Sequence, residues 1–263
     1  MTARPLLGVV HLWPLASAAR HRAGPEAMPA LFDAALADAR AYADGGCDGV
    51  VVENFGDAPF HRGTADDPVP PDVPASLAIA ADRIRGATGL RVAINCLRND
   101  ACAALGAAVA AGATWIRVNV LTGAYVTDQG LVTGDAARLF AYRRRLGSDV
   151  CVLADYLVKH AVPLAPIDVA AGARDLAERS GAAGLVLSGT RTGEPVGVEL
   201  LDTVRRAVGS FPIWIGSGLD PDNAASLWPR CDGAIVGTFC KRDGRVSNPV
   251  DERRVAALRA ACR

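Results

Sequence analysis

The feature of this sequence that most constrains its fold is a regular alternation of short apolar runs with longer, alanine-rich amphipathic segments. Strands that are apolar throughout and alternate with helices are typical of a parallel sheet buried on both faces. The apolar runs predict eight strands: Leu6–His11, Gly49–Asn54, Arg91–Asn95, Trp115–Asn119, Val150–Val158, Gly184–Ser188, Ile213–Gly216 and Gly233–Gly237.

Helical patterns fill the intervals between these strands. Several of them end in a similar small-residue phrase before the next strand, for example DGGCDGVVV and AAGATWIRV, which suits a glycine-closed helix and a short turn. The predicted helices are Ala30–Asp44, Pro74–Thr88, Asp100–Ala111, Gly134–Leu146, Ile167–Ser180, Leu200–Val208, Pro221–Trp228 and Pro249–Cys262.

Repeated strand–helix units in a chain of 263 residues match the ~250 residues of a typical (β/α)8 barrel. We therefore predict the α/β class, with one eight-stranded parallel (β/α)8 TIM barrel domain over residues 1–263. An open doubly wound sheet is the alternative. The Gly- and Pro-rich stretch Phe55–Val73 is expected to be a long loop over the catalytic face of the barrel.

Charge and cysteine usage exclude several classes of protein. Lys plus Arg and Asp plus Glu balance at 28 each, so no overall field attracts nucleic acid or an anionic membrane. The seven Cys residues include no CxxC pair and are expected to be reduced thiols. His11 and Pro14 interrupt the first apolar run, so we expect no membrane span and a cytoplasmic protein.

Polar side chains stand at the carboxyl ends of the predicted strands, which meet at the mouth of a parallel barrel. An unpaired buried charge is costly, so such residues are expected where the barrel opens to substrate. The candidate substrate-binding residues are His11, Asn54, Asn95, Arg117, Asn119, Thr122 and Asp128, and the candidate catalytic residues are Glu53, Asp155, Lys159 and His160.

Asp155 and Lys159 are the leading candidates for acid–base chemistry, and they share a face if the strand extends that far. A lysine in a dry pocket near other cations has a lowered pKa and can act as a base or as an imine-forming amine. His160 is a second proton carrier and Glu53 another general base. The structural alternatives are ion pairs of Asp155 with Lys159 and of Glu53 with Arg117.

The segment Leu121–Gly130 is dense in hydrogen-bonding groups and is predicted to be a polar loop after the fourth strand. A substrate lid or a second anchoring loop is our functional interpretation. An ordinary surface loop is the alternative.

Glycines at the ends of the last three predicted strands favour a phosphate-binding site. They let backbone N–H groups approach an anion, and a short helix after each loop would direct its positive end to the same place. Barrels frequently bind phosphate after strands seven and eight. The predicted phosphate-binding residues are Ser188, Gly189, Gly216, Ser217, Gly218, Gly237 and Thr238.

No metal site is predicted, because HxH, HxxxH and HExxH spacings are absent from the sequence. No cofactor is predicted either. An FMN- or nucleotide-binding barrel remains an alternative, since FMN would use the same terminal phosphate site.

Long and unusual phrases of the sequence, such as DGVVVENFGDAPF, IRVNVLTGAYVTDQGLVTG, LADYLVKHA and GAIVGTFCKRDG, resemble the BtpA/SgcQ family. The resemblance extends from Leu7 to about Val255. It implies a phosphate-binding (β/α)8 barrel and directs attention to Glu53–Phe60, Arg117–Gly130 and Asp155–His160. A cyanobacterial member is implicated in photosystem I biogenesis, and other members accompany sugar-phosphate enzymes.

We therefore expect an enzyme acting on a small phosphorylated, sugar-like or nucleotide-like metabolite. Lyase, isomerase and glycosyl transferase chemistry all suit the candidate residues. The alternative is a non-catalytic photosystem I assembly or regulatory factor. The expected partner is a phosphorylated small molecule, and homo-oligomerisation stays open.

Overall fold

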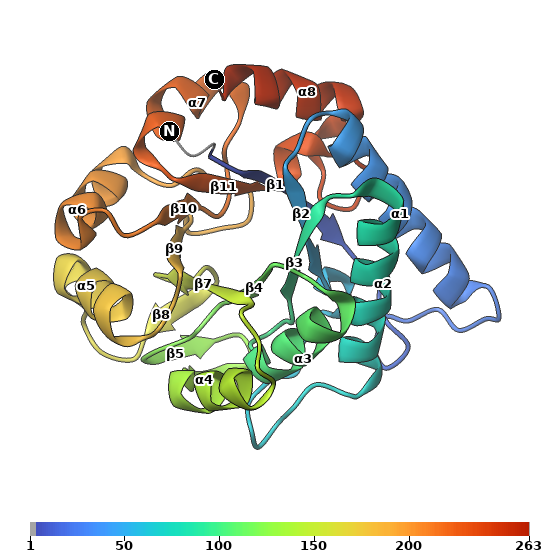
Figure 1. Cartoon of the computed structure of the whole chain (residues 1–263), viewed down its shortest axis with the longest axis horizontal. Coiled ribbons are helices and arrows are strands. Elements are labelled where there is room, and N and C mark those ends of the chain that lie inside the picture. The colour runs from blue at the N-terminus through green and yellow to red at the C-terminus, as the bar shows by residue number, and fades with distance from the viewer. Residues whose placement is uncertain (1–3, 263) are drawn as a thin grey trace.

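The computed structural model describes residues 4–262, in which eight parallel strands close into a barrel (Figure 1). Around the barrel the order is β1-β11-β10-β9-β7-β4-β3-β2. The (β/α)8 prediction is therefore confirmed, and the alternative of an open sheet is wrong. The barrel strands are β1 (Leu6–His11), β2 (Gly49–Glu53), β3 (Arg91–Asn95), β4 (Trp115–Val118), β7 (Cys151–Tyr156), β9 (Gly184–Leu187), β10 (Ile213–Ile215) and β11 (Gly233–Val236).

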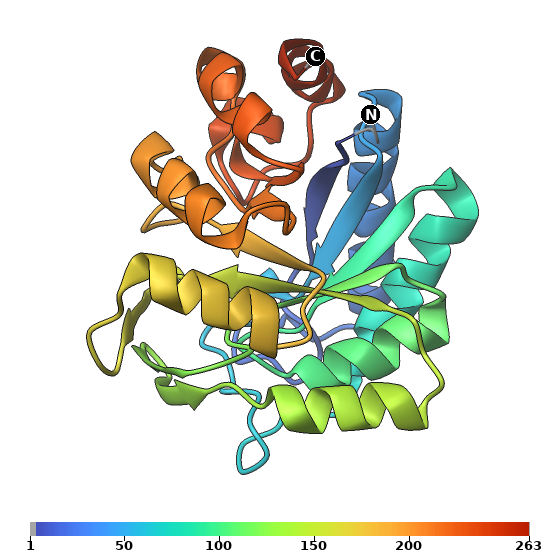
Figure 2. The same ribbon diagram turned by 60° about the vertical axis from the view of Figure 1, so that its left-hand side comes forward.

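Helices surround the barrel as an outer ring, which Figures 1 and 2 show from two directions. They are α1 (Ala27–Asp44), α2 (Asp72–Thr88), α3 (Ala101–Ala111), α4 (Ala136–Arg145), α5 (Val169–Arg179), α6 (Val198–Val208), α7 (Pro221–Leu227) and α8 (Glu252–Ala261). Short 3-10 turns are η1 (Phe55–Asp57), η2 (Trp228–Arg230), η3 (Thr238–Cys240) and η4 (Arg242–Gly244). Within residues 4–262, no helix is both long and apolar enough to cross a bilayer.

The barrel interior is filled by apolar side chains from alternating strand positions. Trp115 and Trp214 are the largest of them, with ring centroids 6.2 Å apart. Gly233 makes room for Trp214, since a Cβ there would lie 2.7 Å from the indole. The interior is a packed core rather than a channel, so a site is expected at the polar mouth.

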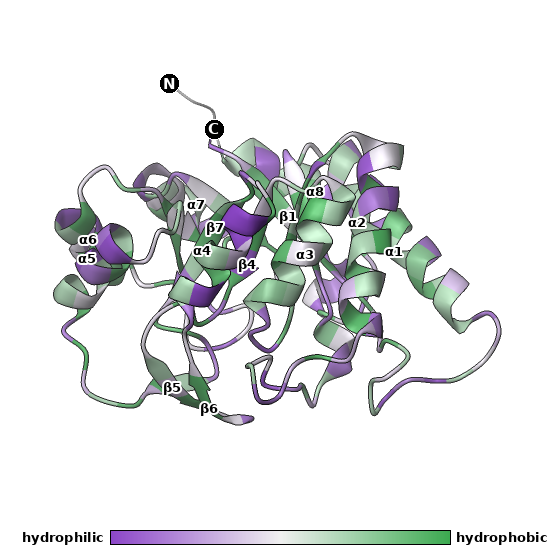
Figure 3. Ribbon diagram, turned by 60° about the horizontal axis from the view of Figure 1, so that its bottom comes forward, coloured by the Kyte–Doolittle hydropathy of each residue, from purple (hydrophilic) through white to green (hydrophobic). Residues whose placement is uncertain are grey.

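A small antiparallel sheet is the main departure from the predicted elements. Its order is β6-β5-β8, with β5 (Ala124–Thr127), β6 (Gly130–Thr133) and β8 (Ala161–Pro163). The prediction that Leu121–Gly130 is a polar loop is wrong over Ala124–Thr127, which form β5; the turn into β6 follows. Figure 3 shows this hairpin projecting from one end of the barrel.

The fifth barrel strand is shorter than predicted and ends at Tyr156. Leu157 follows with a φ of 56° and His160 with a φ of 54°. This left-handed backbone breaks the strand and turns the chain towards β8. Lys159 is therefore carried by a tight turn and not by the strand that carries Asp155.

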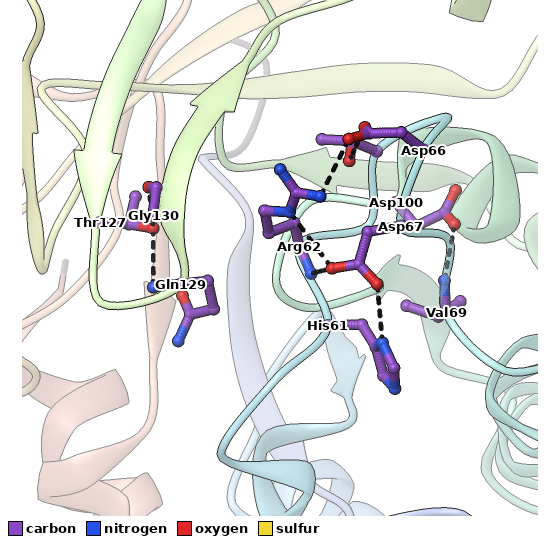
Figure 4. A network of polar contacts seen from close by, with 10 residues as sticks. His61, Arg62, Asp66, Asp67, Val69, Asp100, Thr127, Gln129 and Gly130 are labelled. Carbon is purple, nitrogen blue, oxygen red and sulfur yellow. Dashed lines mark hydrogen bonds and ion pairs between the residues drawn. The ribbon is translucent and has the colours of Figure 1, made fainter.

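The loop between β2 and α2 is organised around one carboxylate. Asp67 accepts hydrogen bonds from the backbone N–H and the Nε of Arg62, at 2.9 and 3.3 Å. His61 Nδ1 lies 2.9 Å from the other oxygen of Asp67. Figure 4 shows these contacts together with those of the turn between β5 and β6. The long loop is thus held in a defined conformation beside the mouth.

Candidate active site

A pocket opens at the carboxyl ends of β2, β3, β4 and β7, and it brings together predicted site residues from these four strands and from three connecting segments. Glu53, Asn95, Arg117, Asn119, Asp128, Asp155, Lys159 and His160 all line it. Phe55, Phe60, Leu97, Arg98, Val158 and Thr192 complete the wall. The catalytic candidates therefore share one pocket, as the strand-end argument requires.

Arg117 and Asp155 form a bidentate ion pair across the neighbouring strands β4 and β7. Arg117 Nε and Nη2 donate to the two carboxylate oxygens at 2.9 and 3.0 Å. Asn119 Nδ2 donates to the same carboxylate at 2.7 Å. Burial alone would lower the pKa of Arg117, but the charge and hydrogen bonds of Asp155 outweigh burial and raise it. Both charged groups are thus fixed in position.

The two ion pairs considered from the sequence, Glu53 with Arg117 and Asp155 with Lys159, are both absent from the described part of the chain. Asp155 takes Arg117 as its partner instead. Glu53 accepts a hydrogen bond from Asn95 Nδ2 at 2.7 Å, because Glu53 and Asn95 stand opposite each other on β2 and β3. The Asn95 amide orients one oxygen of Glu53, and no Lys, Arg or His of the described residues lies within ion-pair distance of this carboxylate.

Lys159 lines the pocket from the turn after β7. Burial first, and then the nearby Arg117 guanidinium, lowers its pKa from 10.5 to about 8. A fraction of this amine is therefore unprotonated near neutral pH. His160 is more exposed, and its Nε2 lies 3.2 Å from Thr192 Oγ1. Burial, with Arg98 and Lys159 nearby, lowers the pKa of His160 below its ordinary value.

Besides His11, which is described below, two predicted substrate-binding residues lie outside this pocket, Asn54 and Thr122. Asn54 Nδ2 donates to Asp57 at 2.9 Å, and Asn54 Oδ1 accepts from the Leu97 backbone at 2.7 Å. These bonds tie the loop after β2 to the loop after β3, so its amide is used in loop structure. Thr122 is at the base of the hairpin, where its backbone packs against Gly134. The structure does not bring either of them to the other site residues.

His11 ends β1 between the pocket and the glycine-rich loops. Its ring contacts Phe55, with centroids 4.7 Å apart, and a Cβ on Gly237 would lie 3.2 Å from its Cε1. Burial, then the charges of Lys241 and Lys159, lowers the pKa of His11 to about 3. No group among the described residues hydrogen-bonds its buried Nδ1. The ring is thus neutral at pH 7.

The loops after β9, β10 and β11 meet on the other side of the mouth. Gly189 and Gly218 lie against the backbone of Glu194, and Gly193 lies against Thr238. The Ser217 hydroxyl donates to the Glu194 carbonyl at 3.1 Å. Small residues are therefore required here partly for loop-on-loop packing.

Ser188 and Gly216, also predicted to bind phosphate, face the centre of the barrel. The Ser188 hydroxyl would lie 2.4 Å from a Cβ on Gly216, and Arg117 Nη2 would lie 3.4 Å from it. Within residues 4–262, nothing hydrogen-bonds the buried Ser188 Oγ. Ser188 thus lies between the glycine-rich loops and the Arg117–Asp155 pair.

The backbone amides of Gly218, Leu219, Thr238 and Phe239, which follow β10 and β11, have no hydrogen-bond partner among the described residues. The N-terminus of α7 is different, because Asp220 caps the amides of Asp222 and Asn223. The N-terminal amides of α7 are therefore occupied by Asp220 and are not available to an anion. The amides before the helix are the available donors.

Arg98, which sequence reasoning missed, lines the pocket from the loop after β3. Its Nη2 donates to the Lys159 carbonyl at 2.7 Å. It belongs to no strand end, and the phrase NCLRND was noted only as part of the family resemblance. The available signal was an arginine directly after a buried apolar run. In the part of the chain that the structure describes, no group of three His, Cys, Asp or Glu could hold a metal ion.

Comparison with known proteins gives one family and one fold. The family model described as the BtpA family matches residues 2–263. Photosystem I biogenesis protein BtpA of Synechocystis is 44% identical over 98% of this chain and 87% of its own length.

Solved structures with the same fold are much more distant in sequence. N-(5'-phosphoribosyl)anthranilate isomerase of Pyrococcus furiosus has a TM-score of 0.59 at 12% identity, over 99% of this chain and 98% of its own. Tryptophan synthase of Mycobacterium tuberculosis has a TM-score of 0.63 at 18% identity, over 99% of this chain and 93% of its own. At these identities the likeness concerns the fold alone.

Proposed function

The chain belongs to the BtpA family, and we propose that it is an enzyme that transfers protons on a small phosphorylated metabolite bound across the barrel mouth. The observation that carries this proposal is the division of the mouth into two halves. One half is a pocket of ionisable side chains, and the other consists of glycine-rich loops with unpaired backbone amides.

The phosphate would bind at the amides of Gly218, Leu219, Thr238 and Phe239. Backbone N–H groups from two neighbouring strand ends can donate to several oxygens of one phosphate without a bulky side chain between them. The hydroxyl of Thr238 is next to these donors. The isomerase with the same fold is named for a phosphoribosyl substrate, in agreement with this assignment.

Lys159 and Glu53 would carry the protons. With its pKa at about 8, Lys159 supplies a neutral amine that can accept a proton near the working pH of most enzymes. Glu53, held by Asn95, is the second proton-transfer group. The Arg117–Asp155 pair and Asn119 would orient the reacting end. Isomerisation, epimerisation or aldol-type cleavage would all use these groups.

The phosphate assignment is tested by a charge placed beside the amides. Thr238→Asp adds a carboxylate that repels phosphate, and Thr238→Asn is the neutral control. We expect sorbitol 6-phosphate, but not sorbitol, to raise the melting temperature of the native chain and of Thr238→Asn. Thr238→Asp should lose this shift. An equal shift in all three proteins would refute the phosphate site.

An imine mechanism is a special case, in which the amine of Lys159 attacks a substrate carbonyl and water leaves. The chain has only two lysines, Lys159 and Lys241, and Lys241 is buried in an ion pair with Asp38. Borohydride reduction during turnover of a sugar phosphate should therefore attach substrate to Lys159 only. Turnover without any adduct on Lys159 rules out the imine and leaves proton transfer.

The second candidate function is a role in photosystem I assembly, favoured by the 44% identity to the Synechocystis protein. It is tested by expressing this chain in a Synechocystis strain that lacks its own BtpA. Restored photosystem I with both the native chain and Lys159→Met would favour a binding scaffold. Restoration by the native chain alone would link assembly to the chemistry of the mouth.

A further inference from the structure

Arg98 is a buried cation that the proposed acid–base chemistry does not use. Its side chain lines the pocket, and the residue is only 8% exposed. Its one side-chain hydrogen bond in the described chain goes to the Lys159 carbonyl. A guanidinium has five N–H donors in a planar fork, so most of its donors remain available to a ligand.

The carboxylates near Arg98 are hydrogen-bonded to other residues and form no ion pair with it. Asp155 is occupied by Arg117 and Asn119, and Glu53 accepts from Asn95. Within residues 4–262, no carboxylate lies within ion-pair distance of Arg98. A buried guanidinium without a carboxylate partner is unfavourable by itself, and the bound ligand is the natural source of the missing anion.

The position of Arg98 relative to the glycine-rich loops after β10 and β11 determines where the anionic groups of that ligand must lie. In the closed ring β1-β11-β10-β9-β7-β4-β3-β2, β3 is four strands from β10 in either direction. Arg98 follows β3, and Gly218 follows β10. The two anion-binding elements thus lie on opposite sides of the mouth. Glu53 ends β2, next to β3, and Lys159 contacts Arg98 through its carbonyl.

We propose that Arg98 binds a carboxylate at the end of the substrate opposite its phosphate, so that the substrate is a phosphorylated acid. This inference rests on the proposed function. The planar fork of arginine matches a carboxylate in bidentate geometry. A second phosphate fits less well, because Glu53 and Asp128 also line this pocket and repel a dianion more strongly than a monoanion.

The test compares ligands that differ only in the carboxylate. 6-Phosphogluconate and sorbitol 6-phosphate have the same six-carbon chain, as 3-phosphoglycerate and glycerol 3-phosphate share a shorter one. By calorimetry, the native chain should bind the acid of at least one pair about tenfold or more tightly than its alcohol. Arg98→Gln should abolish this preference while keeping the affinity for the alcohol within about twofold.

Two variants serve as controls. Arg98→Lys keeps the charge without the fork and should retain part of the preference. Arg62→Gln removes a cation from the neighbouring loop that is paired with Asp66 and Asp67, and it should leave the preference unchanged. Unchanged binding of the alcohol by Arg98→Gln also shows that this variant is folded.

The outcomes separate this inference from the proposed function. The carboxylate assignment alone is overturned if the native chain binds acid and alcohol with equal affinity, or if its preference for the acid survives Arg98→Gln. In both cases Thr238→Asp must still weaken the binding of the phosphorylated alcohol. If neither member of either pair binds, the phosphate site and the carboxylate site fail together.

Discussion

Arg117 and Asp155 are buried side chains, 5% and 4% exposed, and the charge of each is compensated by the other. Removal of one partner leaves an uncompensated buried charge, which typically costs about 3–5 kcal/mol of stability. We predict this loss for Asp155→Leu and for Arg117→Met, measured by urea unfolding at pH 7. The double variant should be clearly more stable than the sum of the two losses implies. Additive losses would contradict a direct pair.

The amine of Lys159 should titrate with a pKa well below that of an ordinary lysine. The folded pKa of about 8 is below the ordinary 10.5, so between these pH values the unfolded state binds more protons. The stability of the native chain relative to Lys159→Met should therefore rise as the pH increases through this window. Labelling with acetic anhydride at increasing pH, read by mass spectrometry, should give a midpoint near pH 8. A midpoint above pH 10 would contradict the dry pocket.

At the residue scale, the sequence predicts the site where side chains follow directly from strand ends. Glu53, Asn95 and Arg117 are on the strands that aim them into the pocket. Arg98 escaped prediction because its place depends on a loop conformation that also involves Asn54. The sequence also offered Glu53 as the ion-pair partner of Arg117, and this was wrong for a related reason, since Arg117 pairs with Asp155. Alternation tells which face a side chain occupies, but not which neighbouring strand it reaches.

The hairpin of β5 and β6 shows why one element was missed. Its strands have four residues each, and β5 pairs on its other side with β8, more than thirty residues along the chain. Short strands of this kind are stabilised by tertiary pairing rather than by their own pattern. The alternation of buried Tyr125 with exposed Val126 is not visible in the sequence, because both side chains are apolar; the local signal was the turn ending at Gly130.

The loops that form the proposed phosphate site should be sensitive to a single methyl group. Gly218 has a φ of 72°, and a Cβ there would lie 2.3 Å from the backbone of Glu194. We predict that Gly218→Ala destabilises the chain by about 1–3 kcal/mol and weakens the binding of sorbitol 6-phosphate. Thermal unfolding and calorimetry measure both effects.

Gly197 is the matched control on the same loop region, since a Cβ there meets nothing within 4 Å and its φ is −68°. Gly197→Ala should change stability by about 0.5 kcal/mol and leave ligand affinity unchanged. If the two variants behave alike, the close packing of these loops is not what shapes the site.

At the scale of the whole molecule, the barrel closes where β1 pairs with β11. Lys241, just after η3, is buried in an ion pair with Asp38 on α1, and the other oxygen of Asp38 accepts from the Val250 backbone. This contact ties the first helix to the last loop. We predict that Asp38→Asn costs about 3 kcal/mol or more, because it leaves Lys241 buried without its partner.

Asp33 on the exposed face of the same helix provides the control. Asp33→Asn should change the free energy of unfolding by less than about 0.5 kcal/mol. Equal effects of the two substitutions on urea unfolding would show that closure of the barrel does not depend on the buried pair.

The architecture was the most predictable level. Barrel strands buried on both faces have apolar sequences. Periodicity alone therefore located all eight strands to within one residue, except at the end of β7, which lies two residues before the predicted bound. Leu157 there continues the apolar pattern but has left-handed backbone. Periodicity reports burial and not backbone direction, and this turn could not be found from it.

The central claim is that phosphate binds on one side of the mouth, opposite the acid–base pocket. A crystal structure of the chain soaked with sorbitol 6-phosphate tests it most directly. The account predicts the phosphate within hydrogen-bond distance of the amides of Gly218 and Thr238, with the sugar chain extending towards Lys159. A phosphate bound at Arg98 and Lys159 instead, with the glycine-rich loops unoccupied, would contradict it.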